Sequence, residues 1–190
     1  MKLIGSTTSP YVRRIRLLLG DRDYEFVNLD IYGEGREQLR RTNPALRIPV
    51  LIDGGQEVYD SRVIARYLGS SQNVKPLSWD QENHLTLIDA ANDSCVTLLL
   101  SRRSGLDVNQ DVLFYNLQRE RVITSLRTLA ALAGEGRFDE WHYPSMCLYC
   151  LVDWLEFRSL VDFDGIESLQ SFRDLNRSQP MVSRTDPRDN

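Results

Sequence analysis

The sequence predicts a small α/β unit over residues 1–72, followed by an all-helical unit over residues 79–190. In the first 70 residues, short apolar or alternating segments typical of strands alternate with segments of helical periodicity. A polar stretch with Gly, Ser and Pro follows at residues 69–78 and predicts a linker. Beyond it the pattern is helical throughout. This change of pattern favours an α/β unit joined to a helical unit.

The α/β unit is expected to have the element order β-α-β-α-β-β-α. Its first helix begins at Pro10, because proline fits the first helical position and Ser9 just before it is a favoured cap. An Asp-Gly-Gly segment at residues 53–55 predicts a hairpin turn. Asp60 and Ser61 open the last helix. The expected strands cover residues 1–5, 24–29, 48–52 and 57–59, and the expected middle helix covers residues 37–41.

The second unit is expected to contain four helices. Glycines at position 105 and around positions 134–136 separate them. The last dozen residues contain Pro180 and Pro187 and predict an extended tail. The expected helices cover residues 79–103, 110–133, 145–161 and 166–176.

Composition narrows the classes of protein that the chain can belong to. Of its 190 residues 42% are hydrophobic and 26% are charged, as is usual for a globular protein. A net charge of −4 without a basic run gives no support to nucleic-acid binding. No apolar run is long enough to span a membrane, and the amino terminus lacks the apolar core of a signal peptide. Three cysteines fit a reducing compartment, so a cytoplasmic protein is expected.

Ser9 is the first candidate for chemistry. Its hydroxyl is expected at the positive end of a helix, where backbone N–H groups favour an anion. A helix cap needs only that hydroxyl, and a site for a thiolate needs the same group. Both interpretations stay open from these residues alone.

Pro49 and the Asp60-Ser61 pair are the next candidates. Pro49 is consistent with a proline in an edge strand, the interpretation that the residues alone favour. It is also consistent with a cis bond that exposes the backbone of Ile48 to a peptide-like ligand. Asp60 and Ser61 suit a helix cap, the commoner role, or the recognition of an amino-acid head group. Arg47 suits a solvated surface or a contact with a second carboxylate.

Cys147 and Cys150 form a C-x-x-C pattern in an apolar helical segment. Redox pairs usually open a helix after a strand, so buried structural cysteines are the favoured interpretation. No second pair completes a zinc site, and no metal is expected. His84 and His142 are isolated and receive no role.

Three segments in order resemble the soluble glutathione S-transferase family, and among its members the compact bacterial ones. They are Ser9-Pro10-Tyr11-Val12-Arg13, the stretch from Asn43-Pro44 to Arg47-Ile48-Pro49-Val50-Leu51, and Tyr59-Asp60-Ser61-Arg62-Val63-Ile64-Ala65. Each motif is weak alone, and the three at these separations are specific. The resemblance covers nearly the whole chain and implies a thioredoxin-like first unit, a helical second unit and a homodimer.

The resemblance also implies a site for glutathione. Ser9 takes the position of the catalytic serine, which donates a hydrogen bond to the glutathione sulfur. Pro49 is cis, and the backbone of Ile48 pairs with the cysteinyl residue. Asp60 and Ser61 hold the γ-glutamyl group. Arg47 approaches the glycyl end, and Asp93 lies near the glutamyl pocket on the dimer side.

The chain departs from the family pattern in two places. Asp60 stands where many relatives have the longer Glu. His142 and Ser145 stand where relatives often have the Ser/Thr and Asp of a capping box, which puts reciprocal capping there in doubt.

The function implied is conjugation of the glutathione thiolate to small hydrophobic electrophiles. Tyr11 and Arg102 are candidates for the electrophile pocket. The alternative for Tyr11 is ordinary packing, and the alternative for Arg102 is a solvated position at a helix end. Alternatives are a non-catalytic binding or regulatory protein of the same fold, and a glutathione-dependent peroxidase or disulfide reductase. Cysteine-dependent exchange is disfavoured, because Ser9 stands where such enzymes have Cys.

Overall fold

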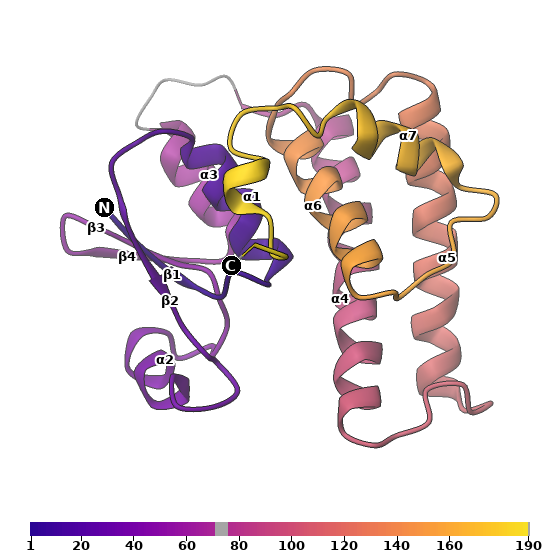
Figure 1. Cartoon of the computed structure of the whole chain (residues 1–190), viewed down its shortest axis with the longest axis horizontal. Coiled ribbons are helices and arrows are strands. Elements are labelled where there is room, and N and C mark those ends of the chain that lie inside the picture. Colours follow the sequence, from indigo (N-terminus) through magenta and orange to yellow (C-terminus); the bar gives the residue numbers. More distant parts are fainter. Residues whose placement is uncertain (71–75, 190) are drawn as a thin grey trace. The chain divides into compact units, whose positions relative to one another are not determined.

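Four strands form a mixed sheet in the order β2-β1-β3-β4 (Figure 1). The computed structural model describes residues 1–70 and 76–189. Strand β1 (Lys2–Gly5) pairs in parallel with β2 (Glu25–Asn28) and antiparallel with β3 (Val50–Asp53), which continues antiparallel to β4 (Gln56–Tyr59). The predicted element order is therefore confirmed.

Each face of the sheet is covered by helices of the same unit (Figure 1). Helix α2 (Arg36–Thr42) lies on one face, where its Leu39 packs with Ile4, Leu29 and Val50. Helices α1 (Pro10–Leu19) and α3 (Ser61–Ser70) lie on the other. The strand register places Leu3, Leu51 and Val58 on that second face, since directly opposed residues point to the same side. All three are buried.

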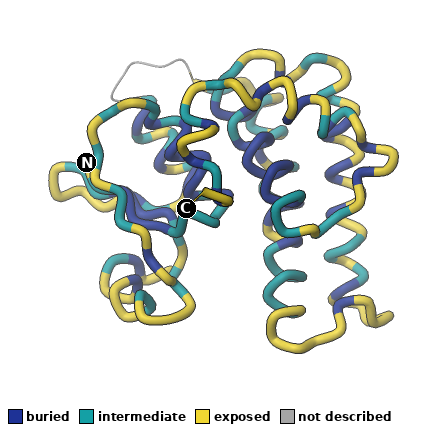
Figure 2. The backbone as a smooth tube through the Cα atoms, in the orientation of Figure 1, coloured by how far each residue is buried: buried dark blue, intermediate teal, exposed yellow. Residues whose placement is uncertain are grey.

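Helices α4 (Trp79–Arg103), α5 (Leu113–Gly134), α6 (Tyr143–Phe157) and α7 (Glu167–Leu175) form the second unit, Leu77–Arg177. Helix α6 is buried along most of its length (Figure 2). Cys147 and Cys150 on this helix are both fully buried thiols that form no disulfide in the described part of the chain, which confirms the structural interpretation of the C-x-x-C pattern. Burial also raises the pKa of Cys95, on α4, to about 12.

The chain end differs from the extended tail that its prolines predict. Residues Ser178–Asn190 belong to the unit of the sheet, Met1–Pro76, and not to the helical unit as the division at residues 79–190 predicts. They include a short 3-10 helix, η1 (Ser183–Thr185), with Val182 and Thr185 buried. Of the predicted linker, residues 71–75 lie outside the described residues, and residues 69–70 complete α3.

The amino-terminal cap of α6 is built from the two residues that replace the family's capping pair. The Ser145 amide donates to His142 Nδ1 at 3.4 Å, and the two side chains lie 2.8 Å apart. The Ser145 hydroxyl also lies 2.5 Å from the carbonyl oxygen of Glu140. His142, which sequence reasoning left without a role, therefore caps this helix.

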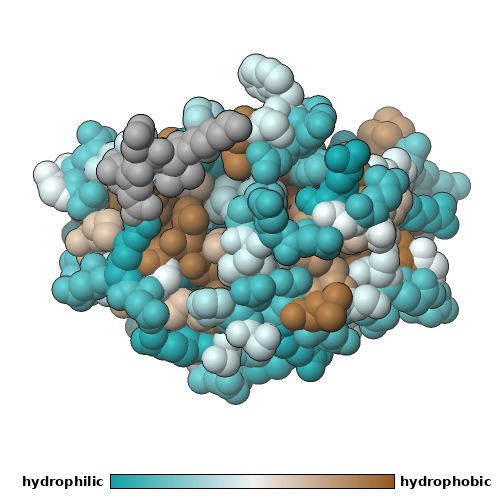
Figure 3. Space-filling model, turned by 90° about the horizontal axis from the view of Figure 1, so that it is seen from above, coloured by the Kyte–Doolittle hydropathy of each residue, from teal (hydrophilic) through white to brown (hydrophobic). Residues whose placement is uncertain are grey.

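The face in Figure 3 is mostly hydrophilic, with separate patches of hydrophobic residues. Among the helices of the described part, none combines the length and apolar character that a membrane crossing requires.

The environment of His84 predicts a pH-dependent stability of the helical unit. Its ring packs on Phe138 at 5.1 Å between centroids, and its buried Nδ1 has no hydrogen-bond partner within residues 1–70 and 76–189. Burial lowers the pKa of His84, and the attraction of Asp80 does not offset this effect. The unfolded chain therefore binds the proton more readily than the folded one. We expect the free energy of unfolding to fall as the pH drops through the ordinary histidine pKa of about 6.5, until the lowered folded pKa has been passed.

The measurement is the free energy of unfolding between roughly pH 7 and pH 5, for the wild type and for His84→Gln. The contribution of one proton cannot exceed about 1.4 kcal/mol per pH unit. The chain has two histidines, so His142→Asn, which keeps a cap acceptor, is the matched control. A slope in His84→Gln as steep as that of the wild type would contradict the assignment.

Candidate functional site

The three predicted motifs meet at one edge of the sheet, the edge at which β1 and β4 end and β3 begins. Ile4, near the end of β1, pairs with Val50, the first residue of β3. Val50 pairs in turn with Tyr59, the last residue of β4. The loop after β1, the segment before β3 and the residues after β4 therefore emerge at the same edge, because both of these strand pairs are antiparallel.

Ser9 is the amino-terminal cap of α1, with extended backbone at φ −86° and ψ 124°. Its Oγ accepts a long hydrogen bond, 3.4 Å, from the amide of Val12. This bond uses an acceptor site of the hydroxyl, and no acceptor pairs with its proton among the described residues. Ser9 can therefore cap the helix and still donate a hydrogen bond to an anion.

The Ile48-Pro49 peptide bond is cis, as the family resemblance implies. The edge-strand interpretation is wrong, since Pro49 directly precedes β3, which lies between β1 and β4. Asn43 holds the loop before this bond. Its side chain, 1% exposed, donates to the carbonyl of Arg47 at 2.7 Å and accepts from the amide of Ala45 at 2.9 Å. Sequence reasoning identified a turn at Asn43 and missed this role, because it depends on burial.

Asp60 and Ser61 follow β4 at the same edge. Asp60 is exposed and has a left-handed backbone, φ 69°. Its Oδ1 accepts from the amides of Arg62 at 2.8 Å and Val63 at 3.3 Å, so it caps α3. Ser61 is only 3% exposed. The pair therefore presents a carboxylate and a hydroxyl at the start of a helix.

Arg14 is a site residue that sequence reasoning missed. Its side chain is fully buried, its Nη1 lies 3.5 Å from Ser61 Oγ, and its guanidinium lies 4.7 Å from the centre of the Tyr11 ring. Arginine is rarely buried, and its contact with Ser61 spans 47 residues, so no local pattern indicates it. The contact joins α1 to α3 and adds a positive charge behind the Ser61 hydroxyl.

The other predicted residues lie in different environments. Arg47 is exposed on the loop before the cis bond, and Tyr11 is half-buried beneath the Arg14 guanidinium. Asp93 and Arg102 lie on α4 in the helical unit, and both are exposed. Arg102 is in the last turn of α4, where a cation complements the helix dipole.

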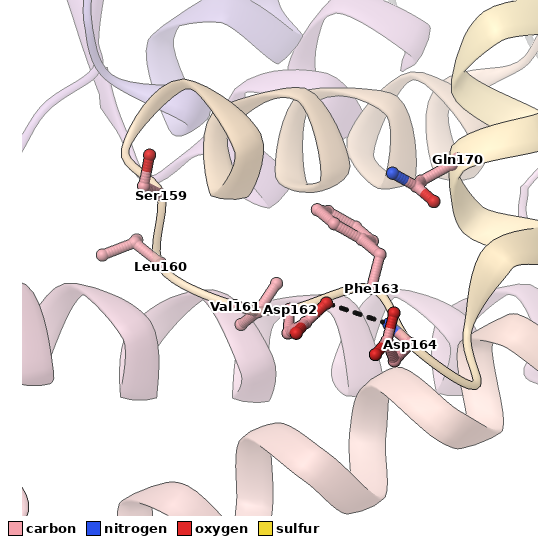
Figure 4. A pocket seen from close by; sticks show the side chains of 7 residues that line it. All are labelled: Ser159, Leu160, Val161, Asp162, Phe163, Asp164 and Gln170. Carbon is pink, nitrogen blue, oxygen red and sulfur yellow. Dashed lines mark hydrogen bonds between the residues drawn. The ribbon is translucent and has the colours of Figure 1, made fainter.

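Two hollows are lined by none of the predicted site residues. One, of about 510 Å³, is in the segment between α6 and α7; Asp162, which accepts from the Asp164 amide at 3.2 Å, and the Phe163 ring line it (Figure 4). It contains none of the predicted site residues. The other, of about 660 Å³, runs along β4 and α3 and includes Tyr59 and Tyr67. Among the described residues, no group of three or more His, Cys, Asp or Glu side chains could hold a metal ion.

The geometry suits a small anionic peptide. A hydroxyl proton at the start of α1, a carboxylate with a hydroxyl at the start of α3, and the backbone beside a cis proline all belong to one edge. Helix amino termini stabilise negative charge, and the Asp60 carboxylate suits an ammonium group. The arrangement can therefore bind a zwitterionic head group together with a second anion such as a thiolate.

Comparisons with known proteins relate the chain to a family of enzymes. Residues 3–76 match the family model for the glutathione S-transferase N-terminal domain. The chain is 29% identical over 172 residues, 83% of each protein, to the "Uncharacterized GST-like protein YibF" of Escherichia coli K12. It is 35% identical to glutathione S-transferase 3 of Zea mays over 74 residues, which are 37% of this chain and 33% of the maize protein.

Solved structures share the fold of the whole chain. A glutathione S-transferase from Methylobacillus flagellatus KT with glutathione bound has a TM-score of 0.84 at 24% identity, and the match covers 98% of each chain. A maleylacetoacetate isomerase crystallised with malonate and glutathione has a TM-score of 0.76 at 20% identity, over 100% of this chain and 98% of that one. The thioredoxin-like sheet unit followed by a helical unit is thus the architecture of glutathione transferases.

Proposed function

Because this chain belongs to the glutathione S-transferase family, we propose that it conjugates the thiolate of reduced glutathione to small hydrophobic electrophiles. The observation that carries the proposal is the common sheet edge of Ser9, the cis Ile48-Pro49 bond and the Asp60-Ser61 pair. The edge offers a donor for sulfur and a pair of groups for an amino-acid head group.

Ser9 is the proposed catalytic residue. In the reaction the glutathione thiol loses its proton to solvent, and the sulfur forms a bond to an electrophilic carbon. The electron pair of the broken bond departs with the leaving group, or the neighbouring carbon of an activated double bond takes a proton from water. A hydrogen bond from the Ser9 hydroxyl stabilises the thiolate, and the start of α1 adds to this effect. Ser9 acts as a donor and not as a nucleophile.

The remaining residues bind the peptide in this proposal. The backbone of Ile48, held by Pro49, pairs with the cysteinyl residue. Asp60 takes the ammonium of the γ-glutamyl group, and Ser61 takes its carboxylate with the support of Arg14. Arg47 approaches the glycyl carboxylate.

Three further assignments complete the proposal. Asp93 assists the glutamyl pocket of a second copy of the chain. Tyr11 and Arg102 contribute to the site of the electrophile, whose conjugation detoxifies it. The protein acts in the cytoplasm.

We expect the chain to form a homodimer. The hollow along β4 and α3 supports this expectation, because Val63, at its rim, is 40% exposed and the half-buried Tyr59 and Tyr67 line it. Light scattering on the purified chain should give twice the 21.9 kDa of one copy. A mass of one copy at micromolar concentration would contradict the expectation.

Calorimetric titration of reduced glutathione into the full chain tests the proposed function. Saturable binding is expected, with weaker binding in Asp60→Ala. Turnover is then measured with an activated aryl halide, followed by the absorbance of the thioether. No binding up to millimolar glutathione would instead favour a regulatory protein of this fold. Binding with reduction of a peroxide, and no thioether, would favour a peroxidase.

A further inference from the structure

The carboxyl-terminal segment of residues 178–189 packs on α1. In Figure 1 the yellow η1 lies beside the indigo α1, and both belong to the same unit. Thr185 is fully buried and Val182 is 4% exposed. Because residues 77–177 form the other unit, the unit of the sheet is discontinuous in sequence and includes this segment.

Two buried arginines of α1 hold this segment. Arg13 donates from Nη2 to the carbonyl of Val182 at 3.1 Å and from Nε to Thr185 Oγ1 at 3.2 Å. Arg16 donates from Nη2 to the carbonyl of Arg184 at 3.3 Å. A buried guanidinium needs hydrogen-bond acceptors, and the segment supplies them to Arg13 and Arg16 of α1.

Thr185 is the centre of this contact. Its hydroxyl donates to the carbonyl of Met181 at 2.8 Å and accepts from Arg13, so its proton and an acceptor site are both used. Met181 has a left-handed backbone, φ 67°, which turns the chain into η1. On the surface, Arg184 forms an ion pair of 2.7 Å with Asp21, just after α1.

The segment contacts α1 at Arg13, one helical turn after Ser9. The Arg13 amide donates to the Ser9 carbonyl at 3.0 Å, so the residue that holds the segment also closes the first turn of the helix. A helix of 10 residues is marginal without packing. The order of the Ser9 cap therefore depends on contacts such as these.

The contact is suited to reversible opening. It consists largely of hydrogen bonds from two guanidinium groups and the attraction of Arg13 to the Asp186 carboxylate, and these groups regain water when the segment leaves. The apolar burial of the segment is small and centres on Val182 and Pro187. Segments with few apolar contacts open at a lower free energy than the core.

We propose that residues 178–189 are a latch whose release loosens α1 and with it the Ser9 cap. A second consequence rests on the proposed function: with the latch open, the Ser9 hydroxyl no longer holds the glutathione thiolate, and the pKa of the bound thiol rises. The carboxyl terminus thereby controls the amino-terminal half of the site.

The test compares Val182→Asp with Ser183→Asp in the full chain. Both add one carboxylate to the segment, but Val182 is buried and Ser183 is exposed. Hydrogen exchange measured by mass spectrometry, without ligand, should show protection in residues 10–19 reduced by roughly tenfold or more in Val182→Asp. Ser183→Asp should match the wild type, and α6 should keep its protection in both variants. Equal protection of α1 in the two variants would overturn the proposal.

Thr185→Val provides a second variant with nearly the same volume. It removes the hydrogen bonds of the hydroxyl with Arg13, Met181 and Val182 and should also reduce the protection of α1. If the two latch variants reduce it while the wild type binds no glutathione, the latch stands and the proposed function fails. If the wild type binds glutathione and these variants change neither α1 protection nor the thiol pKa, the latch proposal fails alone.

Discussion

Replacing Ser9 with alanine is expected to raise the pKa of the bound glutathione thiol and to slow conjugation about 100- to 1000-fold. This range is the usual loss when one donor to a developing or resident anion is removed from a preorganised site. The affinity for glutathione should change much less, because the peptide keeps its proposed contacts with Ile48, Asp60 and Ser61. The thiol pKa is measured from the thiolate absorbance of the complex as a function of pH.

The structure separates the two roles of Ser9. Its Oγ accepts from the Val12 amide at 3.4 Å, a length that makes the cap bond weak. Loss of the cap should therefore cost no more than about 1 kcal/mol of stability. The hydroxyl proton is the group that the thiolate needs, and Ser9→Thr keeps it. We expect Ser9→Thr to retain a lowered thiol pKa.

Thr8→Val is the matched control for this prediction. Thr8 carries the neighbouring hydroxyl, which lies 3.2 Å from Ser6 Oγ, and valine preserves its shape. The control should leave the thiol pKa and the rate unchanged. If Ser9→Ala keeps the wild-type thiol pKa, Ser9 has no part in the stabilisation of the thiolate.

Local patterns in the sequence were sufficient for much of this fold. Helix α4 begins and ends where its periodicity predicts, at Trp79 and Arg103. Helix α5 starts at Leu113 and not at residue 110, because the turn before it is fixed by longer-range bonds: Arg119 donates to the carbonyls of Val108 and Gln110. Helix α6 ends at Phe157. The left-handed residue that follows it is Ser159 and not a glycine, so the sequence does not indicate this end.

The candidate site also contains some residues that local sequence patterns predict and others that they do not. Ser9, Asp60 and Ser61 were predictable because a helix start has its own local signals, and the order of three motifs indicated a family. The buried Arg14 and the chain end were not, since their partners are distant in sequence. Arg14 meets Ser61, and Thr185 meets Arg13 across 172 residues. Such contacts leave no periodicity in either segment.

The largest effect on binding is expected at Asp60. Asp60→Asn should weaken the affinity for glutathione by about 10- to 100-fold, because it removes the negative charge proposed to face the γ-glutamyl ammonium. Asparagine suits the left-handed backbone of this position and keeps an oxygen for the Arg62 and Val63 amides. The change therefore isolates the charge from the cap. Calorimetric titration with reduced glutathione measures it.

Asp60→Ala and Asp23→Asn complete the comparison. Alanine removes the charge and the cap together, so it should lose affinity as asparagine does and lower the free energy of unfolding by about 1 kcal/mol as well. Asp23 is exposed and precedes β2, at the opposite edge of the sheet, and its change to Asn alters the net charge equally. Its affinity should stay at the wild-type value. If Asp60→Asn also binds as the wild type does, the shorter side chain at this position does not reach the ammonium, and Asp60 serves only as the cap of α3.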